Sequence, residues 1–277
     1  MILVTGAKGQ LGTDILVELS NRSLSAKGVD VCDFDITDKN TVNGVLQALR
    51  PKTVIHCAAY TAVDKAEDES ELCFLINEEG TRNIAQACKH INAKMIYIST
   101  DYVFAGKGEH FYKPYDQTLP LSAYGASKLA GEKAVLDTLD EMFIVRISWV
   151  FGKNGNNFVK TMLRLGHELD SINIVSDQIG SPTYTVDLAR LLCDMACSTK
   201  FGIYHATNEG ECSWSDFAKE IFLKAGMSTK VNPIPATSYP TKAIRPYNSR
   251  LDKTCLDESG FLRLPHWKDA LSRYFDN

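Results

Sequence analysis

Near its N-terminus the chain reads Ile2-Leu-Val-Thr5-Gly-Ala-Lys-Gly-Gln-Leu-Gly12, and this segment carries the strongest signal of the fold class. An apolar run leads into a turn with three glycines, after which apolar residues recur at helical spacing. The pattern predicts a buried strand, a tight turn and a helix. Glycines at 6, 9 and 12 depart from the Gly-x-Gly-x-x-Gly dinucleotide fingerprint, and glycines also make ordinary strand-to-helix turns. Because a pyrophosphate needs close backbone approach and free N–H groups at a helix start, we expect Gly6, Gly9 and Gly12 to bind a cofactor.

The segments that follow alternate between strand and helix signals and predict an open parallel sheet. We expect strands at 29–31, 53–57, 94–98 and 143–147, and helices at 38–49, 70–90, around Tyr124, 158–169, 186–197, 213–225 and 266–275. The predicted class is α/β, a Rossmann-like doubly wound parallel sheet with a smaller, discontinuous C-terminal substrate lobe. The sheet domain would take residues 1–150 and a return segment, 181–206. The lobe would take 151–180 and 207–277.

Composition excludes several classes of partner. The net charge of −4 gives no global field for nucleic acid or acidic lipid, so we expect neither as a partner. No basic region precedes the first apolar run, and no window reaches the length of a membrane helix, so we expect a cytoplasmic protein without a membrane partner. The eight cysteines form no Cys-x-x-Cys pair, and the six histidines show no ligand spacing. We therefore expect reduced thiols and no metal.

Tyr124 and Lys128 stand one helical turn apart and outline hydride-transfer chemistry. Residues at i and i+4 share a helix face, so the Lys128 ammonium would favour the ionised phenol and bring its pKa toward neutral pH. Such a tyrosine can serve as a general acid. Thr100 ends the strand before this helix, and its hydroxyl can hydrogen-bond a substrate carbonyl. Since neighbouring strand residues face opposite ways, only one of Ser99 and Thr100 should reach the site.

The choice of cofactor depends on two residues near the glycine-rich turn. Asp30 closes the second predicted strand, where a carboxylate can bind the adenosine ribose and repel a 2′-phosphate. This role of Asp30 favours NADH. Alternatively, Asp30 is an exposed turn residue that does not bind the cofactor. Lys8 lies in the turn and can offset a phosphate charge, so NADPH stays open. Asp35 and Ile36 are candidates to flank the adenine.

Six motifs carry a resemblance that runs nearly end to end. They are Thr5-Gly-Ala-Lys-Gly-Gln-Leu-Gly12, Ala58-Ala-Tyr-Thr-Ala-Val-Asp-Lys-Ala66, Ser99-Thr-Asp-Tyr-Val-Phe104, Tyr124-Gly-Ala-Ser-Lys128, Asp177-Gln-Ile-Gly-Ser-Pro-Thr183 and Arg245-Pro-Tyr-Asn-Ser249. The chain resembles extended short-chain dehydrogenases/reductases, and within them the dTDP-4-dehydrorhamnose reductase family. The resemblance implies Thr100, Tyr124 and Lys128 as the catalytic set, with Asp101 and Trp149 against the sugar. It also places around the cofactor Gly9, Gln10, Leu11, Asp30, Asp35, Ile36, Ala59, Tyr60 and Thr61. We expect Ala58 to bind the cofactor as well.

Three further residues are candidates for the sugar-nucleotide. Trp149 follows a predicted strand, and its indole can cover the apolar face of a deoxysugar, although it can equally be core. Arg245 can bind a diphosphate through its forked donors, and Asn157 can donate at a helix start, although both can also be surface residues.

The resemblance implies NAD(P)H-dependent reduction of the C4 ketone of dTDP-4-dehydro-L-rhamnose to dTDP-L-rhamnose, in deoxysugar biosynthesis. One alternative is a nucleotide-sugar epimerase or dehydratase, although the dehydratase pattern Thr-Asp-Glu is here Thr100-Asp101-Tyr102. Another is a non-catalytic nucleotide-binding regulatory subunit, against which the intact catalytic set argues. The dTDP-sugar would be the small-molecule partner, and a homodimer is left open.

Overall fold

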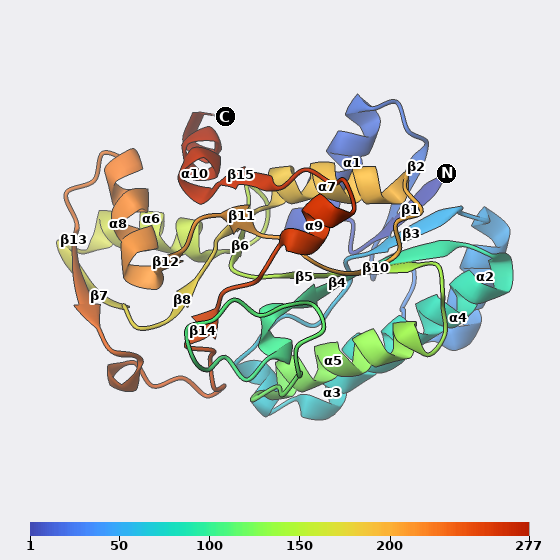
Figure 1. Ribbon diagram of the computed structural model, residues 1–277, viewed down its shortest axis with the longest axis horizontal. Helices are drawn as coiled ribbons and strands as arrows, with labels where there is room; N and C mark the ends of the chain where they lie inside the picture. Colours follow the sequence, from blue (N-terminus) through green and yellow to red (C-terminus); the bar gives the residue numbers. More distant parts are fainter. Residues whose placement is uncertain (277) are drawn as a thin grey trace.

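Six parallel strands form the main sheet of the computed structural model, which describes residues 1–276 (Figure 1). Their order across the sheet is β10–β5–β4–β3–β1–β2. The strands are β1 (Ile2–Thr5), β2 (Ala26–Val29), β3 (Thr53–His56), β4 (Lys94–Thr100), β5 (Met142–Ile147) and β10 (Gly202–His205). The order changes direction between β1 and β3. In open α/β sheets the crevice at the carboxyl ends of such strands binds ligands.

The central strands are buried along their length, as expected for parallel strands covered on both faces. The predicted α/β class and parallel sheet are confirmed. The largest departure from a predicted range is β2, which ends at Val29, so Asp30 follows the strand, and Val31 is exposed. The strands β3, β4 and β5 differ from their predicted ranges by one or two residues at an end. The sequence of this edge strand, Ala-Lys-Gly-Val, carries too weak an apolar pattern to fix its limits.

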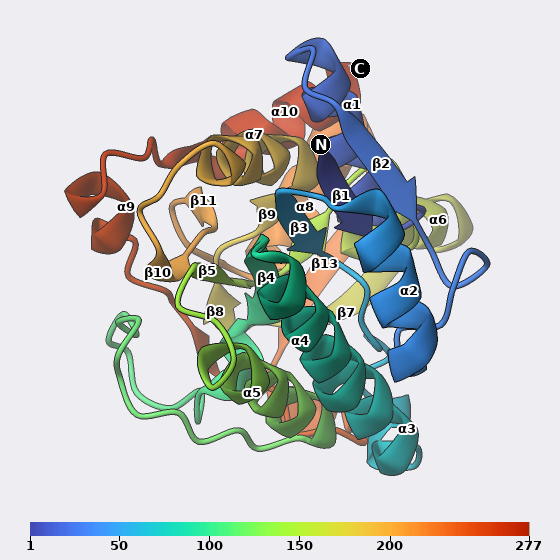
Figure 2. The same ribbon diagram turned by 90° about the vertical axis from the view of Figure 1, so that its right-hand side faces the viewer.

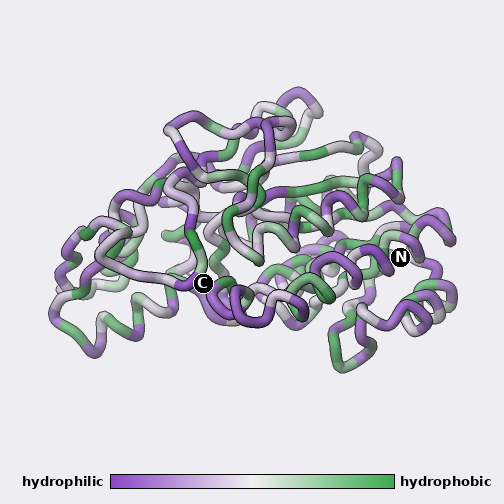
Figure 3. Tube along the Cα trace, turned by 90° about the horizontal axis from the view of Figure 1, so that it is seen from below, coloured by the Kyte–Doolittle hydropathy of each residue, from purple (hydrophilic) through white to green (hydrophobic). Residues whose placement is uncertain are grey.

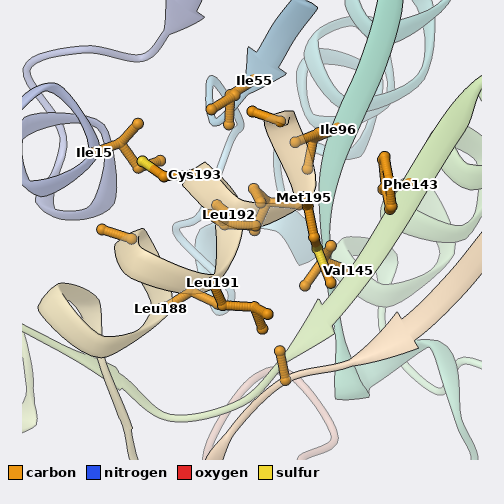
Figure 4. Close-up of a cluster of buried hydrophobic side chains, with 14 of the residues drawn as sticks. Ile15, Ile55, Ile96, Phe143, Val145, Leu188, Leu191, Leu192, Cys193 and Met195 are labelled. Atoms are coloured by element: carbon orange, nitrogen blue, oxygen red, sulfur yellow. The ribbon is translucent and has the colours of Figure 1, made fainter. Parts of the chain in front are cut away.

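Helices cover both faces of the sheet (Figure 2). One face carries α1 (Gln10–Asn21) and α7 (Thr185–Ala196), and the other carries α2 (Lys39–Leu49), α4 (Thr81–Ile91) and α5 (Ala123–Leu136). Figure 4 shows how Ile15 of α1 and Leu192 of α7 meet the sheet residues Ile55 and Ile96. A second apolar cluster fills the opposite face. Asp38 caps α2 as predicted, since its carboxylate accepts from the N–H groups of Asn40 and Thr41.

The helix predicted over 70–90 is a composite. It comprises α3 (Ser70–Phe74), a π-helical turn η2 (Leu75–Gly80) and α4. Buried Asn77 lies in the π-helical turn, accepts from the Tyr60 N–H at 2.8 Å, and donates to the Ser127 hydroxyl at 3.0 Å. The irregular turn therefore ties the segment after β3 to α5. Irregular turns of this kind frequently mark functional sites.

A second region has its own apolar core, built around Phe151, Phe217 and Trp267. Its helices are α6 (Phe158–Glu168), α8 (Trp214–Lys224) and α10 (Trp267–Asp276). The short helix α9 (Thr254–Glu258) instead packs against β10, and its Leu256 belongs to the same apolar cluster as Ile15 and Leu192. Its short strands are β6 (Val150–Phe151), β7 (Ser171–Val175), β8 (Ile179–Gly180), β9 (Thr183–Tyr184), β11 (Asn208–Glu209), β12 (Cys212–Ser213), β13 (Lys230–Ile234), β14 (Asn248–Ser249) and β15 (Leu264–His266). Short 3₁₀ turns are η1 (Lys65–Glu67), η3 (Asp101–Val103) and η4 (Ala236–Ser238). Figure 3 shows hydrophobic stretches in both regions.

The pairing of β13 with β7 is the main element that the sequence did not predict. The sequence of β13, Lys-Val-Asn-Pro-Ile, contains a proline and polar residues and so carries little strand signal. No helix among residues 1–276 is long and apolar enough to cross a membrane. Across the same residues, no group of three or more His, Cys, Asp or Glu side chains is arranged to hold a metal ion.

Candidate active site

A cavity of about 770 Å³ opens at the carboxyl ends of the sheet strands. Its wall begins at the glycine-rich turn after β1, passes the ends of β2, β3 and β4, and reaches α5 and the segment after β5. The predicted residues that line it are Gly6, Lys8, Gly9, Gln10, Leu11, Gly12, Asp30, Asp35, Ile36, Ala58, Ala59, Thr61, Thr100, Asp101, Tyr124, Lys128 and Trp149. The predicted cofactor and catalytic residues therefore share one cleft, with Tyr60 as an exception.

The glycine-rich turn is packed so tightly that side chains are excluded. Gly6 has a φ of +64°, and a Cβ there would lie 2.7 Å from the Ala58 nitrogen. A Cβ on Gly12 would lie 2.2 Å from the Gly6 carbonyl oxygen. Gly9 precedes α1 without a capping side chain, so the first N–H groups of the helix face the cleft. This turn is a cradle for an anionic group.

Asp30 and Lys8 lie together at one end of the cavity. The Asp30 carboxylate accepts from the Lys8 backbone N–H at 2.8 Å and from the Val31 N–H at 2.9 Å. The Lys8 ammonium donates to the Cys32 thiol at 2.9 Å. The Asp30 carboxylate therefore holds the glycine-rich turn in shape and also lines the cleft. The Lys8 ammonium lies near the same end of the cleft.

Tyr60 points away from the cleft. Its phenol donates to Glu69 at 2.6 Å, and its backbone N–H donates to Asn77. Tyr60 thus fixes the segment that presents Ala59 and Thr61, without lining the cavity itself.

Thr100, Tyr124 and Lys128 come from two elements and face the same part of the cavity. Thr100 ends β4, and α5 begins at Ala123 because the Ser122 hydroxyl caps it by accepting from the Gly125 N–H at 3.1 Å. Thr100 and Lys128 are buried and Tyr124 is half-buried, and the Thr100 hydroxyl forms a hydrogen bond with the Tyr124 phenol. The neighbouring Ser99 hydroxyl instead donates to Glu132. The two hydroxyls therefore face different partners, although Ser99 lines the cavity together with Thr100.

The charge states differ from those predicted. Burial raises the pKa of the Tyr124 phenol well above its ordinary value, a rise that the Thr100 hydrogen bond only partly opposes. Burial also lowers the pKa of Lys128 to about 7, against the opposing effect of Glu132. The prediction that Lys128 brings the Tyr124 pKa toward neutral was therefore wrong for this state. The spacing of Tyr124 and Lys128 indicates that the two side chains are close. It does not indicate the desolvation that disfavours both the phenolate and the ammonium.

Asp101 and Trp149 line the same cavity. Burial raises the pKa of the Asp101 carboxyl to about 6. Its Oδ1 accepts from the Thr100 hydroxyl at 3.1 Å, and its buried Oδ2 makes no hydrogen bond of normal geometry within residues 1–276. Trp149 has a φ of +49°, rare for a residue other than glycine, and its rings stack on Trp214 at 3.6 Å. Strained backbone of this kind clusters at functional sites.

A second cavity of about 650 Å³ lies behind the two tryptophans. It is lined by residues of α6, β7 and the segment 236–247, which includes Arg245, and by Trp214. Arg245 donates to Asp64 at 2.5 Å and also hydrogen-bonds Tyr102, which lines the first cavity. The two cavities therefore meet along Trp149–Trp214 and Tyr102–Arg245.

Asn157 lies at the predicted helix start, but its side chain is already engaged. Its Oδ1 caps α6, and its Nδ2 donates to Gln10 and to the Gly152 carbonyl, both at 2.8 Å. It joins the glycine-rich turn to the second region and lines neither cavity. Trp214, Asp64 and Tyr102 were missed as site residues. Two of them stood inside quoted motifs, but nothing in the sequence indicated that they meet Arg245.

A Rossmann-type sheet with threonine, tyrosine and lysine in one cleft defines a protein of the short-chain dehydrogenase/reductase class. The model of the RmlD substrate binding domain family matches residues 1–277. The chain therefore belongs to the RmlD family.

Three relatives illustrate the similarity. A dTDP-4-dehydrorhamnose reductase of Streptomyces griseus is 40% identical over 280 residues, covering 99% of this chain and 92% of the relative. A dTDP-4-keto-6-deoxy-D-glucose reductase of Streptomyces niveus is 36% identical over 275 residues, covering 99% and 96%. The crystal structure of dTDP-4-dehydrorhamnose reductase from Bacillus anthracis in complex with NADP has a TM-score of 0.97 at 44% identity, covering 99% of this chain and 98% of that one.

Proposed function

We propose that this protein reduces the C4 ketone of dTDP-4-dehydro-L-rhamnose to dTDP-L-rhamnose, using a reduced nicotinamide dinucleotide. The observation that carries the proposal is the common cleft of Thr100, Tyr124 and Lys128, with a glycine-rich cradle at its other end. Membership of the RmlD family supports the substrate. In this proposal the sheet domain, 1–150 with 181–206, binds the dinucleotide. The lobe, 151–180 and 207–277, binds the sugar-nucleotide.

The cleft fits a dinucleotide. A side chain at Gly6 or Gly12 would fill the cradle, and the N-terminus of α1 supplies N–H groups for a pyrophosphate. Asp30 and Lys8 would meet the adenosine ribose, with Asp35 and Ile36 beside the adenine. Ala58, Ala59 and Thr61 would line its central part. When bound, the dinucleotide supplies the hydride.

Tyr124 then acts as the proton donor. Because burial raises its pKa, the phenol stays protonated at neutral pH and can deliver its proton to the ketone oxygen as negative charge develops there. Thr100 orients the same oxygen by donating a hydrogen bond. Lys128, in its ammonium form, holds ribose hydroxyls and stabilises the phenolate that remains after proton transfer.

The sugar-nucleotide would extend from one cavity into the other. Asp101, with a buried oxygen free of a normal hydrogen bond, can accept from a sugar hydroxyl, and Trp149 can cover the apolar face of the deoxysugar. Arg245 lies where a diphosphate would pass toward the second cavity, and would exchange its Asp64 contact for phosphate oxygens. Asn157 supports the site through Gln10 and α6.

The test is an absorbance assay of the reduced nicotinamide with dTDP- and UDP-linked 4-keto-6-deoxysugars. We expect one equivalent of cofactor to be consumed for each equivalent of the dTDP-linked ketone. An epimerase or dehydratase keeps its cofactor through the cycle and would show no net consumption. A protein that consumes neither cofactor but binds a protein partner tightly would instead be a regulatory subunit.

For the choice of cofactor we propose that both forms are used. Asp30 binds the ribose of NADH, and Lys8 can leave Cys32 for the 2′-phosphate of NADPH. Lys8→Met should raise the KM for NADPH about tenfold, since a hydrogen bond to a charged group contributes about 1.5–3 kcal/mol. The KM for NADH should stay within about twofold, and equal effects on both cofactors would refute the role of Lys8.

A further inference from the structure

A buried carboxylate lies beneath the active site. Glu132 stands one helical turn after Lys128 on α5 and is only 1% exposed. Its Oε1 accepts from the Ser99 hydroxyl at 2.5 Å and from Arg146 Nε at 2.8 Å, and its Oε2 accepts from Arg146 Nη2 at 2.7 Å. Both oxygens of the Glu132 carboxylate therefore accept hydrogen bonds from residues of two sheet strands, β4 and β5.

These contacts hold together the elements that carry the site. Ser99 directly precedes Thr100 at the end of β4, and Arg146 lies on β5, three residues before Trp149. The third donor of Arg146 goes to the Pro114 carbonyl at 2.8 Å. One carboxylate thus fixes the ends of both strands to the helix of Tyr124 and Lys128.

A contribution to the stability of the fold does not by itself explain the buried ion pair between Glu132 and Arg146. The Glu132–Arg146 ion pair is almost wholly buried, with side-chain exposures of 1% and 3%. Taking two charges out of water costs so much that well-packed apolar residues of similar volume are often as stabilising. An ion pair retained here is better explained by what it does to the neighbouring site.

Lys128 is the neighbour on which the charge acts. Its ammonium lies 4.1 Å from the centre of the Tyr97 ring. Glu132 opposes the effect of burial on the Lys128 pKa more strongly than any other charged neighbour. Other titratable groups near Lys128 or Arg146 include His56, Cys57, Cys73, Tyr97, Tyr124 and His205.

Those six groups are uncharged at neutral pH. Burial lowers the pKa of both His56 and His205 to about 3, so both imidazoles are neutral. Burial raises the pKa of Cys57 to about 12, and it also raises the pKa of Cys73, Tyr97 and Tyr124. Glu132 is therefore the negative charge among the groups that act on Lys128 at neutral pH.

We propose that Glu132 is a positioning residue, which fixes the ends of β4 and β5 on α5 and keeps Lys128 charged by placing a carboxylate beside it. The inference rests on the proposed role of Lys128 in the reduction. It adds to that role a residue that touches neither ketone nor dinucleotide.

The direct test is a pH titration of Lys128 in the ligand-free protein by NMR of ¹³C-labelled lysine. The Cε signal of Lys128 is identified by its absence in Lys128→Met. In the wild type we expect a midpoint near 7, and in Glu132→Gln a midpoint lower by about 1 pH unit or more. The matched control is Glu168→Gln on α6, which makes the same change in an exposed ion pair with Arg164 and should leave the midpoint unchanged.

A second readout is the pH profile of kcat/KM. In Glu132→Gln its alkaline limb should move to lower pH, with about a fivefold loss at pH 7 if the midpoint falls from about 7 to about 6. If Glu132→Gln does not fold, the double variant Glu132→Gln/Arg146→Gln, which leaves no unpaired charge, is titrated instead. Its midpoint should also be lowered.

An unchanged Lys128 midpoint in a folded Glu132 variant overturns the proposal. A wild type that titrates as expected but consumes no cofactor with any keto-sugar would instead overturn the proposed function. Because the NMR titration needs neither cofactor nor substrate, the two failures are distinguishable.

Discussion

Tyr124 and Lys128 show how burial decides chemistry at the residue scale. The spacing in the sequence predicted that Lys128 lowers the pKa of the Tyr124 phenol. The structure buries Lys128 and half-buries Tyr124, and this desolvation raises the pKa of Tyr124 and lowers the pKa of Lys128 to about 7. A protonated phenol suits a reductase, because the step that follows hydride transfer requires a proton donor.

Tyr124→Phe tests the proton donor. The substitution keeps the ring but removes the hydroxyl, so kcat should fall by about 10²–10⁴-fold, the usual contribution of general acid catalysis. NADPH binding, measured by fluorescence, should stay close to that of the wild type. A kcat within a few fold of the wild type would show that another group donates the proton.

The pH dependence follows from Lys128. Because burial lowers its pKa to about 7, the ammonium is present below that pH and is lost above it. Since kcat/KM reports the groups of the free enzyme, we expect it to fall as the pH rises through about 7. Lys128→Met should reduce turnover strongly and abolish this limb. A variant with near wild-type turnover would contradict the role of Lys128.

Among the secondary-structure elements, helix α1 and the turn before it require glycines, because the backbone there packs too closely to admit a Cβ. Glycine at position 12 allows the backbone contact with Gly6, whereas Gly44 in α2 has open space around it.

Gly12→Ala and Gly44→Ala form a matched pair for this account. Gly12→Ala should destabilise the fold by about 1–3 kcal/mol, as overpacking does, and weaken NADPH binding. Gly44→Ala should stabilise by about 0.5–1 kcal/mol, because alanine is the better helix former. Chemical denaturation measures both. Equal changes in the free energy of unfolding of the two variants would mean that the close contact between Gly6 and Gly12 does not exclude a side chain at position 12.

The sequence predicted most elements because their signals are local. The strand and glycines at 2–12, the Asp38 cap and the α5 helix with Tyr124 and Lys128 all appear where expected. The π-helical turn at 75–80 and the pairing of β13 with β7 were not predictable, since both depend on distant partners. For the same reason, the Arg245–Asp64 and Asn157–Gln10 contacts, between residues far apart in the chain, were missed.

At the scale of the whole molecule, a ligand must bridge two regions. The first cavity holds the residues proposed for catalysis, and the second lies behind Trp149 and Trp214. Arg245 sits where they meet, so its contribution should appear in substrate binding rather than in the chemical step.

Arg245→Gln should therefore raise the KM for the dTDP-sugar by about 10–100-fold, the loss expected for a charge-assisted hydrogen bond. The kcat should stay within about threefold. Steady-state kinetics of Arg245→Gln beside Arg164→Gln, a change in an exposed ion pair on α6, gives the comparison. An unchanged KM would place the diphosphate elsewhere.

The most direct test of the central claim follows the hydride itself. The purified protein is given dTDP-4-dehydro-L-rhamnose and NADPH carrying deuterium at the transferable position of the nicotinamide, in separate reactions for its two faces. Mass spectrometry and NMR of the sugar then locate the label. We expect one deuterium at C4 of dTDP-L-rhamnose for each cofactor oxidised, with one of the two labelled cofactors. Unlabelled product from both, or a converted sugar without cofactor oxidation, would contradict it.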